Sequence, residues 1–297
     1  MSERVTSAGA DLRVAGVDLA AEAPGTALAV LRVEPGERRP SDSSTRGASH
    51  AGGASVVLEH LRLGVDDDTL LAETRGAELI GIDCAFGWPV DFVDFVARQA
   101  GGARLTSDDT GDLAWRRRLA HRETDRVVTE RTGARPLSVA TDRLGMTALR
   151  CAVLLDRLAG DGRVVERSGE HPSAVVEVYP AMALRVWGLR RPGYKVSGAR
   201  ASAGRDARTA LIADLRRAAP WLELGEHEAL MRDSADALDA VLAALVALAH
   251  RLGCTVPPTA EQRARARVEG WVAIPTVGLA ELGVRAAELV GGLGRAD

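Results

Sequence analysis

The chain has 297 residues, 46% of them hydrophobic, which is enough for one large domain or two small ones. Its formal net charge of −3 gives no overall attraction to nucleic acid, so such contacts need local basic patches. The three cysteines are far apart, which excludes a disulfide framework or a zinc-site spacing and indicates a reducing compartment. The N-terminus has no apolar signal region and no apolar stretch is long enough to cross a bilayer, so we expect a cytoplasmic protein without membrane contact.

The first part of the chain predicts a hairpin followed by a strand–helix–strand unit. After a tail at residues 1–11, the apolar runs predict strands at 12–19, 26–33, 55–63 and 78–83. Residues 34–54 are rich in Ser, Gly, Pro and Arg and predict a loop, and residues 69–75 predict a helix. Because a crossover helix carries the chain back across the sheet, we expect strand four to lie parallel to strand one.

The second part of the chain is mostly helical. A long segment at about 88–170 precedes a β-branched run at 174–179, which predicts a fifth strand. The predicted elements that follow are a helix at 181–187, a loop at 190–207, and helices at 206–218 and 234–252. We therefore predict an α/β domain over residues 12–256, with a mixed five-stranded sheet flanked by helices. A C-terminal helical extension, residues 257–297, is expected to pack on it.

Two predicted strands end in Gly-x-Asp, at Asp18 and at Asp83. A single Gly-x-Asp of this kind is also a common turn signal. If the two strands are parallel neighbours, they lie about 4.8 Å apart and both carboxylates emerge at the same edge. Two carboxylates that close repel one another unless a cation lies between them. Because Mg²⁺ prefers hard oxygen ligands, the pair indicates a divalent metal site.

The helix predicted at 234–252 supplies the third acidic group. It has no charged residue from Ala240 to Ala249, so we expect it to be buried on all sides. Its small residues lie in line with Asp236 and would let the helix approach the sheet closely. Asp236 is therefore a candidate ligand beside Asp18 and Asp83. Asp233 is either a further ligand or the N-cap of the helix, and Asp239 is expected to be an ordinary acid on the helix surface.

Five segments of the chain resemble the domain-of-unknown-function 429 family over roughly residues 12–250. They are Gly-Val-Asp-Leu-Ala at 16–20, Ile-Gly-Ile-Asp-Cys-Ala-Phe-Gly-Trp-Pro at 80–89, Thr-Asp-Arg at 141–143, Glu-Val-Tyr-Pro-Ala at 177–181 and Asp-Ala-Leu-Asp-Ala at 236–240. The resemblance implies a ribonuclease H-like fold, in which the segment at 88–170 is a helical insertion between strands four and five. It also implies a predicted nuclease activity.

A looser resemblance links the same acids to Holliday-junction resolvases of this fold. There, an Asp on strand one, an acid on strand four and an Asp-x-x-Asp on the last helix bind the metals, and Asp18, Asp83 and the pair Asp233 and Asp236 match these positions. Strand four carries Glu in the resolvases and Asp here. Glu73 is at most a weak counterpart of the ribonuclease H glutamate on the first helix. Glu177 on strand five is a candidate fourth ligand, or else a strand residue paired with an arginine, and the choice between Glu177 and Asp233 as the ligand stays open.

Basic residues near these segments are candidates for binding substrate phosphate. They are Arg126 in the arginine-rich stretch of the insertion, Arg143, which could hold a phosphate bidentately, and Lys195 in a loop after Tyr194. Each has a structural alternative. The arginine-rich stretch is equally typical of a solvated helix face, and Asp142 and Arg143 could form a buried ion pair.

We predict from these residues a Mg²⁺- or Mn²⁺-dependent nuclease, a hydrolase with two metal ions. Asp18 would bridge both ions, Asp83 and Asp236 would each hold one, and Glu177 or Asp233 would assist. The expected partner is nucleic acid or a smaller phosphoester. The sequence does not distinguish DNA from RNA as the substrate, or endo- from exo-cleavage. A homodimer is one possible assembly. Two other functions fit the sequence: an actin-like ATP-binding or phosphotransfer protein on the same core, and a non-catalytic nucleic-acid-binding scaffold.

Overall fold

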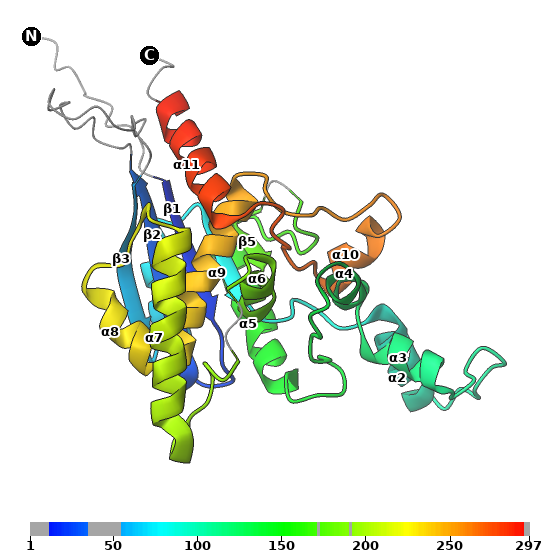
Figure 1. The fold of residues 1–297 in the computed structure, drawn as a ribbon. Helices are drawn as coiled ribbons and strands as arrows, with labels where there is room; N and C mark the ends of the chain where they lie inside the picture. The colour runs from blue at the N-terminus through cyan, green and yellow to red at the C-terminus, as the bar shows by residue number, and fades with distance from the viewer. Residues whose placement is uncertain (1–11, 35–54, 171–172, 190–191, 294–297) are drawn as a thin grey trace, which may run out of the picture.

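A mixed sheet forms the centre of the protein (Figure 1). The computed structural model describes residues 12–34, 55–170, 173–189 and 192–293, so the predicted tail and most of the predicted loop at 34–54 lie outside the described residues. The strands are β1 (Leu12–Asp18), β2 (Ala27–Glu34), β3 (Ser55–Leu63), β4 (Leu79–Asp83), β5 (Val175–Glu177) and β6 (Leu222–Glu223). They lie in the order β5-β4-β1-β2-β3-β6, with helices on both sides. The α/β class is confirmed, but the prediction of five strands missed β6.

The order of the first four strands follows the prediction. β1 and β2 form an antiparallel hairpin, β3 pairs antiparallel with β2, and β4 returns parallel to β1 after helix α1 (Asp67–Glu73). Asp66 caps that helix by accepting a hydrogen bond of 2.8 Å from the backbone N–H of Thr69. In the β1–β4 register, Asp18 lies directly opposite Asp83. The expectation that these two acids are neighbours is therefore confirmed.

Four helices lie between β4 and β5: α2 (Val90–Ala100), α3 (Leu113–Ala120), α4 (Glu123–Thr132) and α5 (Gly145–Gly160). The later helices are α6 (Pro180–Val186), α7 (Ala201–Ala218), α8 (Glu228–Asp233), α9 (Ala235–Arg251), α10 (Arg263–Glu269) and α11 (Leu279–Leu293). Helix α7 begins five residues before the predicted start, because Gly204 is not a loop residue: it provides the space into which the carbonyl of Val196 fits. No helix in the described parts of the chain is long and apolar enough to span a lipid bilayer.

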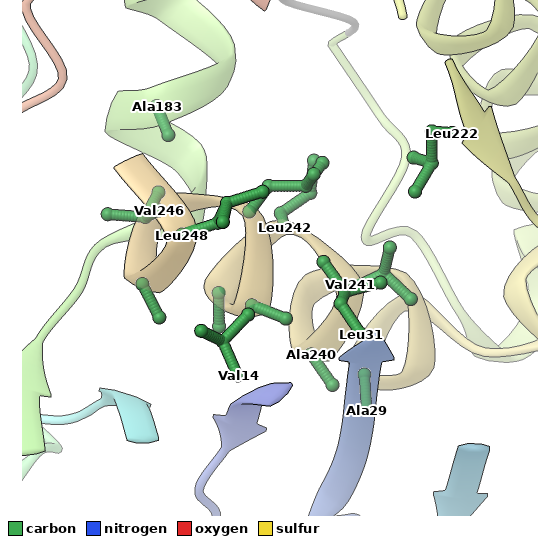
Figure 2. Close-up of a cluster of buried hydrophobic side chains, with 14 of the residues drawn as sticks. Val14, Ala29, Leu31, Ala183, Leu222, Ala240, Val241, Leu242, Val246 and Leu248 are labelled. Carbon is green, nitrogen blue, oxygen red and sulfur yellow. The ribbon is translucent and has the colours of Figure 1, made fainter. Parts of the chain in front are cut away.

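Helix α9 is the core of one side of the sheet, as the sequence predicts. Every residue from Ala237 to His250 is buried, because the sheet covers one face of the helix while α6, α7 and α11 cover the others. Figure 2 shows its side chains clustered with Val14 of β1 and Leu31 of β2. Each fully buried leucine of this helix contributes about 1.5–3 kcal/mol relative to an exposed one.

Two glycines let α9 lie directly against the strands. A Cβ atom on Gly16 would overlap the backbone of Ala240 and Ala244, and one on Gly81 would lie 2.8 Å from the carbonyl oxygen of Ala243. Both glycines are inside their strands, so the Gly-x-Asp pattern marks close helix–sheet contact and not a turn.

Helix α5 covers the opposite side of the sheet. Its residues Cys151, Leu154 and Leu155 are buried in a second apolar cluster together with residues of β1, β2, β4 and α1. Helices α2 and α3 lie away from the sheet at one end of the molecule (Figure 1), and α2 has no buried residue. The chain after α10 runs beside β5, where the backbone N–H of Ala273 donates to the carbonyl of Glu177.

Candidate metal centre

Three carboxylates from three elements meet at the end of β1 and β4. Asp18 and Asp83 close these strands side by side, and Asp239 reaches them from the second turn of α9. One oxygen from each residue can be chosen so that all lie within 4.8 Å of one another. Three carboxylates this close repel one another, and a single hard cation between them would remove that repulsion. We call Asp18, Asp83 and Asp239 the carboxylate cluster.

Asp239 corrects the prediction that places it on the helix surface. Its side chain is buried, because α9 is enclosed on every side and offers no solvated face at this position. Asp239 lies one residue before Ala240, whose backbone contacts Gly16, so the approach of α9 to β1 brings this carboxylate to Asp18. The same absence of charge that identifies the buried helix could have identified Asp239.

The metal-free cluster cannot hold three full negative charges. Burial, followed by the charges of Asp83 and Asp239, raises the pKa of Asp18 to about 9. Burial also raises the pKa of Asp83 to about 7, with Asp239 and Glu177 adding to the shift and Lys195 opposing it. Burial raises the pKa of Asp239 as well, against the stabilising contacts from Lys195 and Tyr194. A divalent cation would favour the ionised forms, and the all-oxygen donor set suits Mg²⁺ or Mn²⁺.

Lys195 and Tyr194 both contact Asp239. The Lys195 Nζ atom lies 2.5 Å from Oδ2 of Asp239, and the Tyr194 hydroxyl donates to Oδ1 at 3.0 Å. Burial opposes the charged form of Lys195, but Asp239, Tyr194 and Asp83 raise its pKa above the ordinary value. Lys195 is therefore a charged group of the centre. The sequence predicts a phosphate contact for it but does not indicate its contact with an acid.

The two acids expected from the Asp-x-x-Asp pattern lie farther out. Asp236 is partly buried at the start of α9; burial raises its pKa, while Lys195, Arg208 and the neighbouring Asp18 oppose the shift. Asp233 ends α8 with a side chain that is 59% exposed and pairs with Arg205 at 2.6 Å. It is not the N-cap of α9, because Ser234 holds that position and accepts from the N–H of Ala237.

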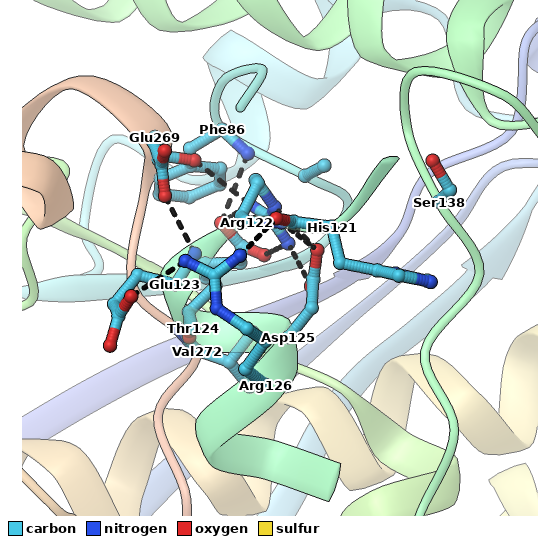
Figure 3. A network of polar contacts seen from close by, with 12 residues as sticks. Phe86, His121, Arg122, Glu123, Thr124, Asp125, Arg126, Ser138, Glu269 and Val272 are labelled. Atoms are coloured by element: carbon cyan, nitrogen blue, oxygen red, sulfur yellow. Dashed lines mark hydrogen bonds and ion pairs between the residues drawn. The ribbon is translucent and has the colours of Figure 1, made fainter. Parts of the chain in front are cut away.

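Glu177 belongs to a second buried network, which we call the arginine network. All five N–H groups of Arg122 are used: they donate to both oxygens of Glu177, to both oxygens of Asp125 and to the carbonyl of Glu269. Glu177 also accepts from the backbone N–H of Phe86 at 3.0 Å. Figure 3 shows Arg122, Asp125 and Glu269 gathered beside Phe86. The charge of Glu177 is thus compensated without a metal.

The predicted phosphate-binding arginines lie in ordinary surface settings. Arg126 pairs with Glu123 at 2.7 Å and donates to the carbonyl of His121, as expected for a solvated helix face. Arg143 is exposed, and within the described residues it has no ion-pair partner. Asp142 does not pair with Arg143 and instead accepts from the backbone N–H of Ser138, so the alternative of a buried Asp–Arg pair is wrong.

A cavity of about 400 Å³ opens next to both networks. Asp18, Asp83 and Lys195 are among its lining residues, and so are Arg122, Asp125 and Glu177. Pro136, Leu137 and Leu144 form an apolar wall between α4 and α5. The cavity therefore combines carboxylates that can hold a cation, one ammonium group, and an apolar surface.

Comparison with known proteins identifies the family of this chain. No curated protein and no solved structure matches it. The sequence model of the family described as "Protein of unknown function (DUF429)" matches residues 16–263, a span that includes the carboxylate cluster, Lys195, and Arg122 with its two acidic partners. The chain therefore belongs to the DUF429 family.

Proposed function

We propose that this protein is a divalent-metal-dependent phosphodiesterase that acts on nucleic acid. The observation that carries the proposal is the carboxylate cluster: three acids from β1, β4 and α9 offer oxygens within 4.8 Å of one another, and two of them, Asp18 and Asp83, line a cavity. Their raised pKa values are the cost of holding them together without a cation. Strongly perturbed acids in a cavity are more typical of a functional site than of a structural one.

A ribonuclease H-like core is part of the proposal. Support comes from the antiparallel β1-β2-β3 unit, the parallel β4 and β5 beside β1, and an acid on a helix packed against β1. The segment from α2 to α5 then corresponds to the helical insertion predicted at about 88–170. Because one fold can carry many activities, the proposed chemistry depends on the residues of the site and not on this likeness.

Each group of residues in the site would have its own role in the reaction. A bound divalent cation supplies an activated water and stabilises charge on a phosphoryl oxygen. Asp18, Asp83 and Asp239 would hold that cation, and the Lys195 ammonium would attract the phosphate from the rim of the cavity. The apolar wall of Pro136, Leu137 and Leu144 would position the neighbouring base or sugar and exclude water.

The other two functions predict different behaviour. An actin-like ATP-binding protein pairs two related domains around the nucleotide, whereas the described residues contain one sheet of this kind. Thermal stabilisation by ATP without hydrolysis of a phosphodiester would favour that function. A scaffold would bind nucleic acid without turnover and without need of the buried carboxylates.

The test is cleavage of labelled single-stranded and duplex DNA and RNA, with bis(p-nitrophenyl) phosphate as a small phosphodiester, in Mn²⁺ or in EDTA. We expect cleavage in Mn²⁺ alone. Asp239→Asn should lower the rate by about 10³-fold, because loss of a metal ligand removes several kcal/mol of transition-state stabilisation.

Asp233→Asn is the matched control for this experiment. It removes the same charge six residues away, from an exposed side chain paired with Arg205, and should leave the rate within a few-fold of wild type. Equal rates for wild type and Asp239→Asn would contradict catalysis at this centre. Hydrolysis of bis(p-nitrophenyl) phosphate without cleavage of DNA or RNA would support the phosphodiesterase activity and contradict nucleic acid as the substrate.

A further inference from the structure

We propose that the centre takes one divalent cation, and that the Lys195 ammonium fills the place beside Asp239 that a second cation takes in a two-metal site. This inference rests on the proposed function and deepens it. The two ions expected from the sequence remain a prediction; the contacts of Asp239 favour one ion and one ammonium.

Both oxygens of Asp239 already have partners from the protein. Lys195 Nζ lies 2.5 Å from Oδ2, and the Tyr194 hydroxyl donates to Oδ1 at 3.0 Å. Asp239 can still offer a remaining lone pair to a cation shared with Asp18 and Asp83, because each carboxylate oxygen accepts more than one contact. A second dication on the far side of Asp239 would have to displace the ammonium or lie next to its charge.

The backbone that holds Lys195 is anchored. Arg208 on α7 donates to the carbonyl of Tyr194 at 2.7 Å and to the carbonyl of Arg232 at 2.7 Å. The carbonyl of Val196, the residue after Lys195, lies where a Cβ of residue 204 would be if it were not glycine. Lys195 therefore extends from a fixed point, with its side chain half-exposed along the cavity and its ammonium at Asp239.

The charges of the centre balance with one dication. Three ionised carboxylates carry three negative charges, and one dication with one ammonium supplies three positive charges. Two dications with Lys195 would exceed the charge of the cluster before substrate arrives. Asp236 is less buried than Asp239, and Lys195, followed by Arg208, favours its ionised form. Even with Asp236 ionised, two dications and one ammonium would carry five positive charges against four negative charges.

Free ligands for a second ion are also scarce. Glu177 has both oxygens bound to Arg122, and Asp233 is on the surface with Arg205. Neither of the two acids that the sequence offers as the fourth ligand is therefore available without breaking an ion pair. The remaining acids can surround one hard cation, with water or phosphate oxygens completing its ligands.

The experiment is a Mn²⁺ titration of the full chain by calorimetry, with electron paramagnetic resonance on the same samples. We expect one Mn²⁺ per chain and no exchange coupling between manganese ions. Lys195→Met should bind a second Mn²⁺ and give an exchange-coupled spectrum, because two ions in one site lie about 3.5–4 Å apart. Lys195→Arg, which keeps the positive charge, should bind one Mn²⁺ per chain.

Arg205→Met is the matched control, since it removes a positive charge that is paired with Asp233 outside the cluster. This variant should also bind one Mn²⁺ per chain. Two coupled ions in the wild type would overturn the inference and leave the proposed function intact. A single ion in Lys195→Met would overturn the role of Lys195. No Mn²⁺ in the wild type would overturn the proposed function itself.

Discussion

Two groups of acids contribute to the lining of one cavity, and they have opposite electrostatics. In the arginine network, Glu177 and Asp125 surround one guanidinium whose five N–H groups are all used. In the carboxylate cluster, three acids share the single ammonium of Lys195, and the pKa of Asp18 rises to about 9. Asp83 and Glu177 stand on adjacent strands of the same sheet, so the difference does not come from the fold.

The difference lies in the number of donors that each group of acids receives. A buried ion network contributes to structure when every charge is paired and every hydrogen bond is made. A cluster left short of positive charge destabilises the metal-free fold and gains most from an added cation. The first arrangement fixes the wall of the cavity, and the second is suited to binding. Substitutions in the two groups test this contrast, from the largest expected effect to the smallest.

Removing the buried arginine should have the largest effect on stability. Arg122→Met leaves Glu177 and Asp125 buried without a positively charged partner, and we expect a loss of about 3–5 kcal/mol in the free energy of unfolding. Urea denaturation measures it. Arg126→Met, on the same helix but in an exposed pair with Glu123, should lose about 1 kcal/mol or less. Equal losses for both variants would mean that the arginine network is no stronger than a surface pair.

Removing an acid from the carboxylate cluster should have the opposite sign. Asp18→Asn abolishes a charge that burial, Asp83 and Asp239 disfavour. We expect the metal-free protein to gain on the order of 2 kcal/mol at pH 8 while it loses metal binding. Urea denaturation in EDTA measures the gain. Asp233→Asn should change stability by about 0.5 kcal/mol or less. Destabilisation by Asp18→Asn would show that Asp18 has a structural role.

The pH dependence of the metal-free protein should also show the shortage of positive charge. The pKa of Asp18 is about 9 and that of Asp83 about 7 in the folded chain, against an ordinary value of 3.8, so the folded state binds more protons than the unfolded state in between. Their contribution to stability is complete below pH 4 and is lost as the pH rises to 9, by up to about 1.4 kcal/mol per pH unit for each proton.

Denaturation midpoints in EDTA from about pH 5 to about pH 9 measure this slope. Saturating Mg²⁺ should flatten it, because the cation takes the place of the protons, and Asp18→Asn should reduce it without metal. Stability that rises with pH over this range in EDTA would contradict the electrostatics of the cluster.

The smallest effect should come from the Tyr194 hydroxyl. Tyr194→Phe keeps the buried ring and removes one hydrogen bond to Asp239, so we expect a loss of about 1 kcal/mol. Tyr179→Phe is the matched control, since its hydroxyl has no hydrogen-bond partner among the described residues. Equal thermal stabilities of the two variants would remove Tyr194 from the groups that stabilise Asp239.

The sheet order around the site could be predicted because the rules that govern it are local. A hairpin, a third strand and a crossover helix leave few ways to place β4, so Asp18 and Asp83 can be paired although they are distant in the sequence. Strand β6 could not be predicted, because two residues carry no periodicity and its pairing with β3 depends on the path after α7. The start of α7 could not be predicted either, because the sequence does not show which backbone segment packs against Gly204.

The candidate site could be predicted only in part. The lack of charge in α9 predicts a buried helix, but Asp236 forms an Asp-x-x-Asp pair with Asp233 and another with Asp239, so the pattern does not show that Asp239 has the more enclosed position and joins the cluster. Glu177 is a plausible metal ligand in the sequence because nothing there links it to Arg122, which lies 55 positions earlier. Long-range ion pairs have no sequence pattern, so the arginine network could not be predicted.

The contact of α9 with β1 has a consequence for how the centre keeps its dimensions. At Gly16 the helix backbone lies against the strand backbone with no side chain between them. The separation of Asp18 and Asp239 is therefore set by two rigid main chains, and substitutions elsewhere in the apolar core can change its packing without spreading the two ligands. Gly16 therefore limits the size of the ion that Asp18 and Asp239 can hold between them.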